Sequence, residues 1–184
     1  MVKETNINLR NFRLWVRDPV RRLLKEKHAG FALAMISFPV LERLVRGKSG
    51  LADKPLNKEP NSSQFYTALT DYFPALHDPP SGTFENVAQV FWQGFRNGIL
   101  HQATFSTKRI TVQKSEQPAA FCSFNLRSGI AIKVSDSKRV IVVDPFAFSK
   151  SVVELIEADF ESYQKADYTH HDLAFGNESW IGSI

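Results

Sequence analysis

The chain contains very little cysteine, and it lacks the common metal-binding motifs. Cys122 is the single cysteine among 184 residues, so one copy can form neither an internal disulfide nor a site built from several cysteines. There is no H-E-x-x-H motif, no paired C-x-x-C and no EF-hand loop. His170 and His171 precede Asp172, but adjacent side chains rarely converge on one ion. We therefore expect no metal and no cofactor, and we interpret Cys122 as a small apolar strand residue.

Long apolar runs are also missing. The most apolar stretch, residues 31–45, is interrupted by Pro39, Glu42 and Arg43 and is too short to cross a bilayer. The first eleven residues are polar and lack the apolar core of a secretion signal. These features predict a cytoplasmic protein that does not associate with membranes.

The composition that is present suits a globular protein, but its charge is uneven. Hydrophobic residues make up 43% of the chain, and the length suits a single domain over residues 1–184, with 167–184 as a loosely ordered polar tail. Residues 1–60 hold 13 Lys and Arg against 6 Asp and Glu, whereas residues 144–184 hold 2 against 8. The basic half could attract nucleic acid through its phosphates, or it could pair with the acidic half within the fold or across a dimer.

Apolar spacing predicts helices over most of the first hundred residues. Asp18 and Pro19 form a helix-start signal, and apolar residues then recur at near-helical spacing as far as Val45. Gly30 and Pro39 are expected to kink this segment or to divide it into two helices.

Further helices follow, separated by turn-forming residues. Gly47 and Gly50 are plausible stops for the first segment, and residues 48–62 are expected to form a loop. A shorter helix is predicted at about 62–73. Thr83 then caps a further helix that runs to about residue 97.

The pattern changes to alternation after about residue 108. Three short apolar runs predict strands: 120–124, 130–134 and 140–143. Asp144 and Pro145 repeat the helix-start signal, and an amphipathic helix follows to about residue 166. We therefore expect a mainly α-helical bundle with a small antiparallel β-meander insert, at about residues 108–144, before the last helix.

One segment carries chemistry, and it directly follows a strongly apolar helical run: Phe91-Trp92-Gln93-Gly94-Phe95-Arg96-Asn97-Gly98-Ile99-Leu100-His101. Arg96 is a permanent cation whose fork of donors matches phosphate. His101 can exchange protons near neutral pH. Together they are a minimal set for cleaving a phosphodiester without a metal. Residues five apart on an uninterrupted α-helix point roughly 140° apart, so a shared site needs a break near Gly98 or a second chain.

An arginine, a polar residue and a histidine at R-x4–6-H spacing after an apolar helix resemble the signature of HEPN domains. Arg96, Asn97 and His101 match it with the shortest spacer, and residues 35–44 resemble an early HEPN helix. The resemblance implies a helical-bundle, metal-independent endoribonuclease of a bacterial defence or toxin–antitoxin type system. It implies a homodimer with the motifs side by side, RNA as substrate and an antitoxin protein as a possible partner.

The resemblance also implies a role for each residue of the motif. His101 would act as general acid–base, Arg96 would bind the scissile phosphate, and Asn97 would orient the histidine or the substrate. Two other interpretations stay open. Arg96 can be a surface residue paired with a carboxylate, or the chain can be a non-catalytic HEPN-like module that binds RNA or protein.

A basic run near the N-terminus is the last feature with functional meaning. It includes Arg17, Arg21, Arg22 and Lys25, with aromatic residues such as Trp15 among them. The run is either a solvated helix face with core anchors or a surface that follows the phosphates of RNA.

Overall fold

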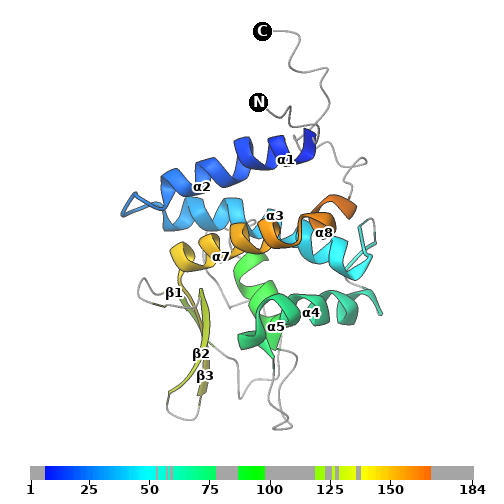
Figure 1. Ribbon diagram of the computed structural model, residues 1–184. Coiled ribbons are helices and arrows are strands. Elements are labelled where there is room, and N and C mark those ends of the chain that lie inside the picture. The colour runs from blue at the N-terminus through cyan, green and yellow to red at the C-terminus, as the bar shows by residue number, and fades with distance from the viewer. Residues whose placement is uncertain are drawn as a thin grey trace.

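The computed structural model shows a helical bundle with a small three-stranded sheet at one end (Figure 1). It describes these residues: 7–52, 54–56, 58, 60–77, 87–97, 119–122, 126, 129–135 and 138–166. The expected mainly α-helical class, with a small β insert before the last helices, is confirmed. Within the described ranges, no helix combines the length and apolar character needed to cross a membrane.

The first helical segment begins earlier than the Asp18 signal predicts. Three elements follow one another without a break: α1 (Ile7–Phe12), the π-helical turn η1 (Arg13–Arg17) and α2 (Asp18–Leu23). Asp18 has helical backbone angles, and its carboxylate accepts a hydrogen bond from Arg17 rather than capping a helix start. The wider π turn ends two residues before Pro19, whose ring would clash with the carbonyl four residues earlier in a regular α-helix.

The long apolar segment divides before Gly30, so α3 (Gly30–Ser49) is a separate helix. Pro39 lies inside α3 without ending it. Gly50 ends it in a left-handed conformation, with a φ of 68°, that glycine adopts without a steric penalty. Gly47, the other expected stop, is a buried residue within the helix.

The remaining helices surround α3. Their bounds are α4 (Asn61–Tyr72), the 3₁₀ turn η2 (Pro74–Leu76), α5 (Val87–Phe91), the π-helical turn η3 (Trp92–Asn97), α7 (Pro145–Ala158) and α8 (Phe160–Lys165). Aromatic rings fill the space between them. Phe38 of α3 lies 4.9 Å from Phe148 of α7, and Phe65 of α4 lies 4.9 Å from Trp92, measured between ring centroids. The core therefore ties α3 to the helices on either side.

The sheet corrects one part of the expected β insert. β2 (Ile130–Ser135) and β3 (Lys138–Val143) form the predicted antiparallel hairpin, but β1 (Ala119–Cys122) pairs with β3 in parallel. The strand order is β1-β3-β2, so the sheet is not an antiparallel meander. Apolar runs locate strands in a sequence, but they do not determine which edge of the hairpin a third strand joins.

Asp144 begins α7 as the sequence predicts. Its carboxylate accepts hydrogen bonds from the backbone N–H groups of Phe146 (2.9 Å), Ala147 (3.2 Å) and Leu126 (3.1 Å). Because the first N–H groups of a helix have no partner within the helix, this buried cap supplies what the helix start lacks.

Replacing Asp144 with alanine is expected to lower the free energy of unfolding by about 1–2 kcal/mol. Urea denaturation of the wild type and the variant measures the difference. Asp144→Asn keeps an acceptor and should lose less. A change in Asp144→Ala below about 0.5 kcal/mol, the range of ordinary surface substitutions, would show that the cap does not stabilise this junction.

Asp159 divides the predicted last helix into α7 and α8. Its carboxylate accepts a hydrogen bond from the Tyr72 hydroxyl (2.7 Å) and one from the Ser162 backbone (3.2 Å). Burial raises the pKa of Asp159, but these hydrogen bonds outweigh burial and hold the pKa below its ordinary value of 3.8. The junction therefore stabilises the fold above about pH 4 and weakens as pH falls through the lowered pKa.

Candidate functional site

Arg96 lies near the end of η3, which continues α5 as a π-helical turn. Phe91, Trp92 and Phe95 of this helical segment are buried in the core. They anchor the backbone that carries Arg96, whose own side chain is 26% exposed. π-Helical turns are uncommon and often occur at functional sites. The half-buried arginine is therefore carried by a backbone that is anchored in the core.

A buried carboxylate holds the Arg96 guanidinium. The Nε and Nη2 groups of Arg96 donate to Oε2 of Glu42, at 3.1 and 2.9 Å. Glu42 lies in α3, and its side chain is only 10% exposed. Two donors on one carboxylate orient the plane of the guanidinium. Pairing with a carboxylate, one of the interpretations open from sequence, is thus what the structure shows for Arg96.

Glu42 binds a second arginine with its other oxygen. The Nε and Nη2 groups of Arg46, one turn along α3, lie 2.9 and 2.8 Å from Oε1. Arg46 also donates through Nη1 to the carbonyls of Leu51 (3.2 Å) and Lys54 (2.8 Å), so it fixes the chain that follows α3. We call Glu42, Arg46 and Arg96 the arginine–glutamate cluster.

The arginine–glutamate cluster joins two guanidinium groups through one carboxylate. All three side chains are largely removed from water. Arginine stays protonated in proteins, and its fork of donors suits a phosphate oxygen as well as a carboxylate. A half-buried guanidinium held in this way has the chemistry to bind an anion.

Sequence reasoning missed Glu42 and Arg46 as members of this site. It treated Glu42 only as an interruption of an apolar stretch. The available signal was the position itself, since a carboxylate in the middle of a core helix must be paired if it is buried. The pairing of Glu42 with Arg46 follows the i,i+4 spacing of a helix. The contact with Arg96, 54 residues away, has no local signal.

The other two members of the predicted motif are placed only in part. Asn97 is the last residue of η3, and the structure describes its backbone but not its side chain. His101 lies outside the described residues. Convergence of Arg96 and His101 on one phosphate therefore stays a prediction from sequence.

The basic run at the N-terminus is partly paired. Arg17 donates to the Asp18 carboxylate at 2.8 Å, and this bond lowers the pKa of Asp18. Arg17 and Arg21 also lie 3.8 and 3.5 Å from the Glu157 carboxylate of α7. At this contact the basic and acidic halves of the chain meet within one copy. Arg22 and Lys25, the other two residues of the predicted phosphate-following set, are exposed.

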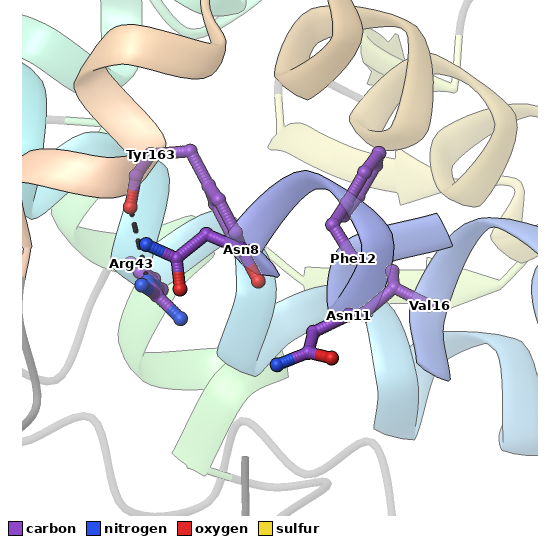
Figure 2. A pocket seen from close by; sticks show the side chains of 6 residues that line it. All are labelled: Asn8, Asn11, Phe12, Val16, Arg43 and Tyr163. Carbon is purple, nitrogen blue, oxygen red and sulfur yellow. Dashed lines mark hydrogen bonds between the residues drawn. The ribbon is translucent and has the colours of Figure 1, made fainter. Parts of the chain in front are cut away.

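A small cavity lies between α1, η1, α3 and α8, and its volume is about 20 Å³ (Figure 2). It is lined by Asn8, Asn11, Phe12, Val16, Arg43 and Tyr163. Arg43 donates through Nε to the Tyr163 carbonyl at 3.0 Å, and its guanidinium lies 4.4 Å from the centre of the Tyr163 ring. This space holds about one water molecule, so it cannot enclose a nucleotide.

Among the residues that the structure describes, no three His, Cys, Asp or Glu side chains are grouped to hold a metal ion. The sequence His170-His171-Asp172 lies outside the described ranges. Comparisons with protein-family models, with curated proteins and with solved structures found no match to this chain.

Proposed function

We propose that this chain is a cytoplasmic, metal-independent endoribonuclease of a bacterial defence or toxin–antitoxin type system. In this proposal Arg96 binds the scissile phosphate, and His101, five residues further along the chain, transfers protons. The observation that supports it best is the arginine–glutamate cluster, in which the carboxylate of Glu42 orients the Arg96 guanidinium on a core-anchored helix.

The proposed chemistry balances without a metal. His101 accepts the proton of a ribose 2′-hydroxyl as the 2′-oxygen attacks phosphorus. Arg96 stabilises the negative charge that grows on the non-bridging oxygens. The bond to the 5′-oxygen breaks, and a protonated His101, in the same copy or in the second copy of a homodimer, returns a proton to that oxygen. The products are a 2′,3′-cyclic phosphate and a 5′-hydroxyl.

A second candidate function is supported by the same contacts. Glu42 binds both Nε and Nη2 of Arg96, which is the pairing that a structural arginine makes. In this alternative the chain is a non-catalytic HEPN-like module that binds RNA or a protein, such as an antitoxin or toxin partner. The two candidates differ in one observable, which is cleavage.

Purified wild type is expected to cut single-stranded RNA in EDTA and to leave cyclic phosphate ends. Arg96→Ala and His101→Ala should each reduce the rate of cleavage at least tenfold, because each removes a group that acts in the transition state. His28→Ala is the matched control, since His28 is an exposed histidine outside the motif, and it should cut at the wild-type rate. End-group analysis of the products measures both rate and chemistry.

Two results would contradict the endoribonuclease proposal. Variants of Arg96 and His101 that cut as fast as wild type would place the activity elsewhere. RNA that binds without being cut by any of these proteins would favour the binding module.

A further inference from the structure

The N-terminal helical segment, α1 to α2, has two faces of opposite character. Its apolar residues Phe12, Val16 and Val20 are buried in the core, each 2% exposed or less. The Phe12 ring packs against Phe160 and Tyr163 of α8, with centroids 5.9 and 5.5 Å apart. The segment crosses one side of the bundle (Figure 1). These apolar residues of the inner face are therefore part of the hydrophobic core.

The outer face presents an aromatic ring among cations. Trp15 is 60% exposed and Leu14 is 51% exposed, both within the π-helical turn η1. Arg10 lies one turn before Leu14, Arg22 lies near the end of α2, and Lys25 lies two residues beyond that end; all three are exposed. We call Arg10, Leu14, Trp15, Arg22 and Lys25 the N-terminal basic face.

Among the described residues, the charge of this segment favours a polyanion. Residues 7–28 contain seven Lys or Arg against two acidic residues, Asp18 and Glu26. Glu157 of α7 also faces the segment and lies near Arg17 and Arg21. These partly exposed ion pairs are weak, and Arg10, Arg22 and Lys25 are exposed cations that Glu157 is not shown to contact. Phosphates of a nucleic acid match these cations.

We infer that the N-terminal basic face binds single-stranded RNA, with Trp15 stacking on an unpaired base and the flanking cations contacting phosphates. An exposed aromatic ring next to a cationic track is the arrangement that sequence-independent single-strand binding uses. Bases within a duplex are already stacked on one another, so Trp15 selects single strands. This inference names the substrate class of the proposed endoribonuclease and rests on that function for its biological meaning.

The same observations disfavour two other occupants. A helix that lies on a membrane inserts a continuous apolar face, but the apolar face of this segment is buried in the core, where Phe12 packs against α8. A protein interface usually has an apolar centre larger than two side chains. Leu14 and Trp15 are flanked by arginines, so neither a bilayer nor an apolar protein surface fits as well as RNA.

The test uses the full chain carrying Arg96→Ala and His101→Ala, so that binding is measured without cleavage. Labelled single-stranded RNA, the same sequence as a duplex, and vesicles of phosphatidylserine and phosphatidylcholine are the three probes. Fluorescence anisotropy is expected to show the tightest binding to the single strand. Trp15→Ala should weaken that binding about tenfold. Arg22→Gln should also weaken it, and the slope of log affinity against log salt concentration should fall by about the amount that one phosphate contact contributes.

Control variants separate stacking from general damage. Phe31→Ala removes another exposed aromatic ring, 40% exposed on α3 and outside the N-terminal basic face, and should leave RNA binding unchanged. Trp15→Phe should keep part of the affinity, because it keeps a ring that can stack. Equal melting temperatures for Trp15→Ala and its parent show that the fold is intact.

The inference is overturned if Trp15→Ala binds the single strand as tightly as its parent, if the duplex binds equally well, or if no RNA binds. Binding to vesicles alone, lost in Trp15→Ala, would also overturn it and assign the face to a membrane. RNA that binds through Trp15 but is never cut by the protein with intact Arg96 and His101 would refute the endoribonuclease proposal and leave this inference standing. If the protein cuts RNA but neither cleavage nor binding depends on Trp15, the endoribonuclease proposal stands and this inference is refuted.

Discussion

Gly47→Ala is expected to destabilise the fold by about 3 kcal/mol or more. Gly47 lies where α3 crosses α8, and a Cβ atom there would overlap the backbone carbonyl of Ser162. The obstacle is backbone rather than a flexible side chain, so the two helices must move apart. Overpacking of this kind usually costs about 1–3 kcal/mol, and the displaced helix also carries Tyr163, which packs in the core.

The direction of the stability change in Gly47→Ala is informative, because a loss of stability is expected where a gain is usual. In a solvent-exposed helix interior, Gly→Ala normally stabilises by about 1 kcal/mol. Gly50→Ala serves as a control because nothing lies within 4 Å of its added Cβ. Its cost should be about 1 kcal/mol and come from the left-handed φ alone. Urea denaturation of both variants measures which one loses more free energy of unfolding. A stable Gly47→Ala protein would show that α3 and α8 do not pack this closely in solution.

Glu42→Ala is expected to lower the free energy of unfolding by about 2–4 kcal/mol. The substitution leaves two arginines, from α3 and η3, without the carboxylate that pairs them. Breaking a buried ion pair by removing one partner costs about 3–5 kcal/mol. The loss expected for Glu42→Ala is smaller than this range because Arg96 and Arg46 are 26% and 14% exposed and regain some hydration.

Two further variants make the Glu42 measurement specific. Glu161→Ala removes a carboxylate that lies 2.7 Å from Lys165 on the exposed side of α8, and such surface pairs contribute little to stability. Glu42→Gln keeps acceptor oxygens and the shape of the side chain, so its loss should fall between those of the two alanine variants. If Glu42→Ala were no more damaging than Glu161→Ala, the arginine–glutamate cluster would not be a buried network.

Local patterns predicted the elements whose causes are local. The helix expected at 62–73 is α4, because its apolar spacing and the flanking prolines act within a few residues. Asp144 caps α7 as predicted, since a cap needs only the next N–H groups. Gly50 ends α3 for a similar reason. The β2–β3 hairpin followed from two apolar runs joined by a short turn.

Other features were only partly predicted or invisible in the sequence because their causes are distant. α2 begins at Asp18 as expected, but Asp18 does not cap a free helix end, because η1 precedes it without a break. The parallel pairing of β1 with β3 depends on which edge of the hairpin β1 joins, and no local pattern determines that edge. Asp159 breaks the last helix, where Tyr72 from α4 donates to its carboxylate.

By itself, the sequence determined the mainly helical class and the ends of several helices, and it singled out the segment for which phosphodiester chemistry is proposed. Propensity, capping and hydrophobic periodicity act over a turn or two, so a linear pattern contains them. Only the tertiary structure decided that Glu42 joins Arg46 to Arg96, and that the apolar side of α1 to α2 is buried while Trp15 is exposed. Those outcomes depend on which helices pack together. A carboxylate that this packing buries must form an ion pair, and an aromatic ring that it leaves uncovered stays in contact with water.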